Sequence, residues 1–177
     1  MHGHPSRLWT MPTLFALHQS LFSFGGDAWI EDEHGNRVYE VDGKAFALGR
    51  TLDLLDPTGA VLLTIHAPVL TLKPTFEISR AGQPIATIRK AMFTLFASRF
   101  SIQLTDGGEL EAAGDILDHE FRISRDETEV VGASRSWFSL HDTFGVQVAD
   151  GFEPPLALAL VIAIEQMERP HDAGPAL

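Results

Sequence analysis

The chain has 177 residues, 45% of them hydrophobic and 21% charged, so we expect one folded domain with a core rather than a disordered chain. It contains no cysteine, which excludes disulfide scaffolds, thiol nucleophiles and cysteine-based metal sites. Its 24 acidic and 13 basic residues give a formal net charge of −11. A charge of this sign repels nucleic acid, so we predict no nucleic-acid partner.

The sequence predicts a flexible tail at each end of the chain. Residues 1–12 lack the long apolar core of a secretory signal, and residues 169–177 are short and rich in Pro and Gly, so both segments are predicted to be flexible. The longest apolar run, Leu156–Ile164, has nine residues, whereas a membrane-spanning helix needs about 20. We therefore expect no transmembrane segment and a cytoplasmic location.

The body of the chain is predicted to be a succession of short strands. Glycine-containing turns recur about every 24 residues, at Gly35, Gly59, Gly82 and Gly107. Between these turns apolar and polar residues alternate, as in Phe100–Thr105, and a period of two is typical of a strand with one face against a core. We expect eleven or twelve strands between Thr13 and Ala149, arranged as an antiparallel meander.

Residues 154–168 break this pattern and predict a helix. Pro154 and Pro155 suit the first turn of a helix, and the Ala- and Leu-rich sequence that follows favours helix formation. The segment is apolar on every side before Glu165, so it must be buried all round. A closed sheet of twelve strands is about 24 Å across, which accommodates one helix.

The predicted fold is therefore mainly β, a closed antiparallel barrel of about twelve strands around a buried hydrophobic C-terminal helix. A single domain of residues 13–168 holds both. A two-sheet sandwich with the helix clipped between the sheets is the alternative. The aromatic side chains of five residues are expected to belong to the core: Phe93, Phe96, Phe100, Trp137 and Phe138.

An ordered set of sequence pieces resembles the LURP-one-related family, which is related to the Tubby C-terminal domain and the phospholipid scramblases. The pieces include Asp56-Pro-Thr-Gly59, Gly114-Asp115, Asp118-His-Glu-Phe-Arg-Ile123, Ser136-Trp-Phe-Ser139, Asp142-Thr-Phe-Gly-Val-Gln-Val148 and the apolar helix. The resemblance implies a twelve-stranded barrel around a hydrophobic C-terminal helix. The chain departs from the family pattern at Glu165, where we expect Asp.

The resemblance implies no settled chemistry. Tubby-like relatives bind phosphoinositides through basic residues on strands. Scramblase relatives carry a palmitoylated cysteine region, which a chain without cysteine does not have.

Four basic residues are the candidate ligand-binding set: Lys73, Arg89, Lys90 and Arg99. If a barrel wall brings them together, they suit a phosphate, for which Arg is the better bidentate partner. The alternative is a solvated outer face on which nearby acids offset these bases.

The sequence predicts no catalytic residue, no metal site and no cofactor. The strand region contains His66, His119 and His141, but they lack the spacing typical of metal ligands and are expected to be structural or exposed. Ser139, His141 and Asp142 mimic a hydrolase set without a nucleophile-elbow motif to support it.

The leading hypothesis is a non-enzymatic binding or scaffold module of the LURP-one-related type, whose ligand is a phospholipid head group or another phosphate compound. The alternative is a protein–protein interaction barrel with no small ligand. An unrecognised hydrolase is the remote alternative.

Overall fold

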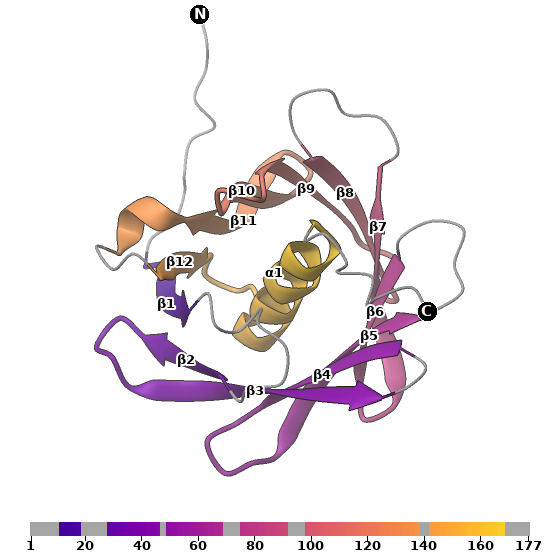
Figure 1. The fold of residues 1–177 in the computed structure, drawn as a ribbon. Helices are drawn as coiled ribbons and strands as arrows, with labels where there is room; N and C mark the ends of the chain where they lie inside the picture. The colour runs from indigo at the N-terminus through magenta and orange to yellow at the C-terminus, as the bar shows by residue number, and fades with distance from the viewer. Residues whose placement is uncertain are drawn as a thin grey trace, which may run out of the picture.

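The computed structural model describes residues 11–18, 28–46, 49–68, 75–91, 98–138 and 142–168. These residues form twelve strands, one short 3-10 helix and one α-helix (Figure 1). The strands are β1 (Thr13–His18), β2 (Ala28–Asp32), β3 (Arg37–Phe46), β4 (Gly49–Leu55), β5 (Val61–Pro68), β6 (Thr75–Arg80), β7 (Gln83–Lys90), β8 (Ser98–Leu104), β9 (Glu109–Asp115), β10 (Glu120–Arg125), β11 (Thr128–Ser134) and β12 (Thr143–Val148). The helices are η2 (Arg135–Trp137) and α1 (Pro154–Glu168).

The sheet closes on itself. Each strand pairs antiparallel with its neighbour in sequence, and β1 pairs with β12 from Thr13↔Val148 to His18↔Thr143. Because every strand then has two partners, the wall presents no open edge strand. The predicted closed antiparallel barrel is confirmed, and the sandwich alternative is wrong.

Alternation along the strands separates an apolar inner face from a polar outer face. In β8, the side chains of Phe100, Ile102 and Leu104 are buried, while Arg99 and the other residues between them point outward and are largely exposed. The buried side chains of the strands form one cluster with those of the helix. A period of two in the sequence therefore becomes an inside and an outside of the barrel.

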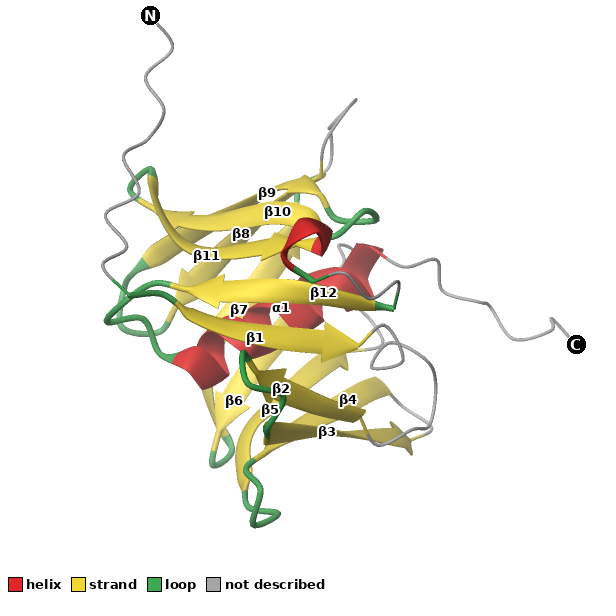
Figure 2. Cartoon of the chain, turned by 90° about the vertical axis from the view of Figure 1, so that its left-hand side faces the viewer, coloured by secondary structure: helices red, strands yellow, loops and turns green. Residues whose placement is uncertain are grey.

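Helix α1 lies inside this wall and fills it. All residues from Ala157 to Met167 are buried, and the helix packs against β5, β6, β7 and β12. Figures 1 and 2 show α1 enclosed by the strands in two perpendicular views. Burial on every side removes the need for a polar stripe, which is why the sequence has none.

The end of the barrel at which α1 begins is made of short turns, and we call it the turn end. In three of these turns an aspartate carboxylate accepts a backbone hydrogen bond, at Asp32, Asp56 and Asp106. Asp56 Oδ1 accepts hydrogen bonds from the backbone N–H groups of Thr58, at 2.8 Å, and Ala60, at 3.0 Å. Side-chain and backbone hydrogen bonds, led by those of Asn36 and Thr58, lower the pKa of Asp32 and Asp56 respectively.

Both ends of α1 are tied to strands by ion pairs. At the turn end, the Glu153 carboxylate pairs with Arg80, and this hydrogen bond raises the pKa of Arg80. At the other end, Glu168 pairs with Lys90 and accepts a hydrogen bond from Ser98. These contacts set how far the helix enters the barrel.

We expect Leu160→Asp to abolish stable folding or to lower the free energy of unfolding by about 3–5 kcal/mol, because it buries a carboxylate without a partner. Leu160 has no exposed surface in the barrel. Urea denaturation measures the change. Leu160→Met is the control, with an expected loss below about 1.5 kcal/mol because it nearly conserves volume. Equal stability of the two variants would contradict the enclosed helix.

Candidate functional site

The four predicted basic residues do not share one face of the barrel. Lys90 follows Ala86 and Ile88 on the inner face of β7, and its Nζ pairs with Glu168 at the end of α1. Arg89, the next residue, lies on the outer face and is exposed. The period of two that places one of these neighbours outside therefore places the other inside.

Arg89 and Arg99 do lie near each other on the outer face. Arg89 is opposite Ser101 in the ladder, and Arg99 is two residues from Ser101, so the two guanidinium-bearing residues are diagonal neighbours. Arg99 Nη1 lies 3.1 Å from Glu111 Oε1, whereas Arg89 has no ion pair within the part of the chain that the structure describes. Lys73 lies outside the described residues, and phosphate binding by the set stays a prediction.

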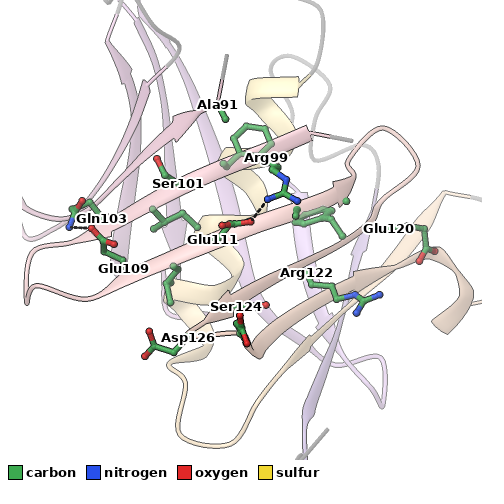
Figure 3. Close-up of a pocket in the computed structure, with 17 residues that line it drawn as sticks. Ala91, Arg99, Ser101, Gln103, Glu109, Glu111, Glu120, Arg122, Ser124 and Asp126 are labelled. Carbon is green, nitrogen blue, oxygen red and sulfur yellow. Dashed lines mark hydrogen bonds and ion pairs between the residues drawn. The ribbon is translucent and has the colours of Figure 1, made fainter. Parts of the chain in front are cut away.

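A groove of about 1030 Å³ lies on the outer face of β8, β9 and β10 (Figure 3), and we call it the outer groove. The floor of the groove is formed by residues with small side chains, which leave a hollow between longer neighbours: Ser101, Ala113, Gly114 and Ser124. Its charged residues are Arg99, Glu109, Glu111, Glu120, Arg122, Asp126 and Glu127. Arg99 is the one predicted ligand residue among the residues that line it.

Gly114 brings β9 and β10 close together at the groove. Its φ of +145° is rarely adopted by other residues, and a Cβ atom there would lie 2.5 Å from the carbonyl oxygen of Glu120. The Gly114-Asp115 piece of the family resemblance thus has a steric reason.

The outer groove carries five carboxylates and two guanidinium groups, a formal charge of −3. Two of the carboxylates are partly compensated by other protein groups. Glu111 pairs with Arg99, and Glu120 accepts hydrogen bonds from Ser134 Oγ at 2.8 Å and the Arg135 backbone N–H at 2.9 Å. The remaining charge disfavours an anionic ligand on this surface.

A second polar site is buried at the inner wall. His119 Nδ1 lies 2.7 Å from Glu165 Oε1 of α1, and these side chains are only 4% and 2% exposed. The His119 ring also stacks on Phe144, with 4.3 Å between ring centroids. His119 turns inward from the β9–β10 connection with a φ of +56°. A pair so well enclosed is placed to hold the helix rather than to meet a substrate.

Comparison with known proteins assigns the fold and the family. The family model described as LURP-one-related matches residues 13–165. The chain belongs to the LURP-one-related family. The protein named "Uncharacterized protein YxjI" of Bacillus subtilis (strain 168) is 29% identical over 148 residues, covering 84% of this chain and 88% of that protein. "Protein LURP-one-related 14" of Arabidopsis thaliana is 19% identical over 155 residues, covering 78% and 76%.

An X-ray structure of an Arabidopsis thaliana protein has the same fold as this LURP-one-related domain. The TM-score is 0.68 at 18% sequence identity, and the match covers 94% of this chain and 97% of that one. At this identity the likeness concerns the fold alone.

Among the aromatic residues of the LURP-one-related domain that were expected in the core, Phe100 is buried there, whereas the expectation for Trp137 and Phe138 is wrong. Phe93 and Phe96 lie outside the described residues. A Cβ atom on Gly145 would lie 2.9 Å from a ring carbon of Trp137 and 3.1 Å from one of Phe138. Gly145 lies on the outer face of β12, between the buried inner residues Phe144 and Val146, so the two aromatic residues pack on the outside of the wall. The local turn of η2 overrides the alternation from which the sequence prediction was made.

The remaining histidines do not form a site in the described residues. His66 Nδ1 lies 3.1 Å from Thr51 Oγ1 on the outer face, and no group of three or more His, Asp or Glu in the described ranges is placed to hold a metal ion. Ser139 and His141, which the hydrolase alternative requires, lie outside these ranges. No helix among the described residues is long and apolar enough to cross a membrane.

Sequence reasoning missed the His119–Glu165 pair and the outer groove. The signal for the pair was present, because a lone acid in an apolar, fully enclosed helix requires a buried partner. The outer groove depends on the register of β9 and β10, which places the small residues Ala113 and Ser124 beside longer ones. The pattern of apolar and polar residues does not predict this register. The family pattern leads us to expect Asp at position 165; here the Glu165 carboxylate reaches His119.

We expect His119 and Glu165 to be energetically coupled. His119→Asn, which tolerates the left-handed backbone, and Glu165→Gln should each lower the free energy of unfolding by about 2–4 kcal/mol. In a double-mutant cycle the coupling should exceed about 1 kcal/mol, because each substitution removes the same contact. Additivity within about 0.5 kcal/mol would show that the contact does not hold the helix.

Proposed function

We propose that this LURP-one-related domain is a non-enzymatic interaction module that binds a protein partner in the outer groove. The single observation that carries the proposal is the groove itself, which encloses a volume of about 1030 Å³ on the outer wall. Helix α1 occupies the barrel interior, where other β-barrels take a ligand, so binding falls to the outside. The proposal includes the cytoplasmic location expected from the sequence.

The composition of the outer groove favours a protein over a small apolar ligand. Polar side chains from three neighbouring strands, among them Ser101, Gln103 and Ser124, face outward beside charged groups. Such groups donate and accept hydrogen bonds along an extended surface, as interfaces between proteins require. An enclosed apolar pocket, the usual site for a small ligand, is a different kind of surface.

Affinity capture with a groove-blocking variant tests the proposal. Ser101→Trp places a bulky side chain in the outer groove from an exposed position, so the barrel should still fold. We expect it to lose a partner that the unmodified chain retains from extracts of its own source. Val61→Trp on β5 is the matched control, because Val61 is 53% exposed and does not line the outer groove. A partner kept by both variants would refute the proposed surface.

A phosphate-binding module is the second candidate, supported by the diagonal pair of Arg89 and Arg99 on the outer face. Two guanidinium groups at such a spacing suit the oxygens of one phosphate group. Two observations count against phosphate binding. Arg99 already pairs with Glu111, at 3.1 Å, and the net charge of −11 repels an anion. A phospholipid head group and a free phosphate compound share this chemistry.

Co-sedimentation with vesicles tests this second candidate. If it is right, the chain binds phosphatidylserine–phosphatidylcholine vesicles more strongly than phosphatidylcholine alone, and Arg89→Ala with Arg99→Ala reduces binding by about tenfold. Competition by inorganic phosphate distinguishes a free phosphate ligand from a membrane surface. Arg37→Ala with Arg135→Ala removes the same charge elsewhere on exposed residues and is the control. Absence of binding at low salt would remove the candidate.

A further inference from the structure

The carboxylates of the outer groove differ in how far other protein groups compensate their charge. Glu111 is compensated by Arg99, 3.1 Å away, and Glu120 is held by the backbone and hydroxyl groups that follow β11. From the described residues, Glu109 receives only a hydrogen bond from Gln103 Nε2, at 3.2 Å. Within the described ranges, the side chains of Asp126 and Glu127 make no hydrogen bond or ion pair.

The register of β9 and β10 brings these less engaged acids to one end of the groove. Ser124 of β10 is opposite Glu111 of β9 in the antiparallel ladder. Continuing this register by two residues toward the turn end places Asp126 opposite Glu109. Figure 3 shows both side chains at the same end of the groove, the turn end. Glu127 follows in the β10–β11 turn, where Asp126 and Glu127 have φ angles of +48° and +65°.

We propose that the outer groove binds an extended segment of its protein partner that carries Lys or Arg side chains. The cationic side chains meet Glu109, Asp126 and Glu127, three carboxylates that line the same end of the groove and complement a positive charge. This inference rests on the proposed function, because it names the chemistry of the partner for the same surface.

The dimensions of the groove suit a short extended segment. On β8 the lining runs over the five residues from Arg99 to Gln103. An extended chain advances about 3.3 Å per residue, so a segment of about five residues matches the groove. Ser101 and Ser124 supply hydroxyl groups for its backbone, while the carboxylates select its side chains.

The charge pattern argues against other occupants of this end of the groove. An anionic segment would meet the three carboxylates of Glu109, Asp126 and Glu127 with like charge. A bound metal ion would need convergent ligands, and the described residues include no group of three or more His, Asp or Glu that could hold one. Ammonium and guanidinium groups on flexible stems need no such convergence.

The test is an NMR titration of the full chain with the peptide Gly-Lys-Gly-Lys-Gly-Lys-Gly and with its Glu counterpart. We expect the Lys peptide to shift backbone amide signals of residues 99–103, 109–113 and 122–127, and the Glu peptide to shift none of them. Raising the salt concentration from about 50 to about 200 mM should weaken the binding of the Lys peptide, because the charges are exposed.

Two matched double variants separate the groove from the general negative charge of the chain. Glu109→Gln with Glu127→Gln should weaken binding of the Lys peptide by about three- to tenfold, because each exposed charge pair contributes up to about 1 kcal/mol. Glu33→Gln with Glu40→Gln changes the net charge equally on the opposite wall of the closed barrel and should have less than about a twofold effect. Equal effects of the two pairs, or no binding at low salt, would overturn the inference.

The inference and the proposed function fail in different ways. If a captured partner is lost with Ser101→Trp but survives Glu109→Gln with Glu127→Gln, the groove is an interaction surface and its partner is not recognised by charge. If Ser101→Trp leaves every captured partner in place, the proposed function itself fails.

Discussion

The fold depends on enclosing a helix that has no polar side. Every side chain from Ala157 to Met167 is removed from water, and a single flat sheet would cover only part of that surface. A sheet rolled into a closed barrel covers all of it, and closure at the same time satisfies the backbone hydrogen bonds of the edge strands. The apolar helix and the closed wall therefore require each other.

Filling the interior has a consequence for where binding takes place. The buried contact between His119 of the wall and Glu165 of α1 seats the helix, and the ion pairs of Glu153 and Glu168 link its ends to the strands. Under the proposed function, the chemistry that distinguishes one partner from another is left to the outward-facing residues of the strands. Outside the region covered by Trp137 and Phe138, the outer face carries little packing, so we expect it to tolerate substitution without loss of the fold.

The fold could be predicted from the sequence because its two signals are local. The alternation in Phe100–Thr105 gives the strand and its buried face, and the unbroken apolar character of 156–164 gives the enclosed helix. The candidate site could be predicted only in part, because it depends on which residues become neighbours across strands. Arg89 and Lys90 are adjacent in sequence yet lie on opposite faces of the wall, and Arg99 acquires Glu111 as a partner only through the β8–β9 register.

The pairing of β1 with β12 also governs the order of events on the ribosome. The first strand can pair with β2 early, but its second partner, β12, is synthesised only after the ten strands between them, and the helix that fills the interior emerges later still. Until then the nascent sheet has two unpaired edge strands, which favour aggregation, and closure must bring together segments that are far apart in the sequence, which slows folding. Molecular chaperones are therefore expected to matter more for the biogenesis of this domain than for a helical bundle of equal length.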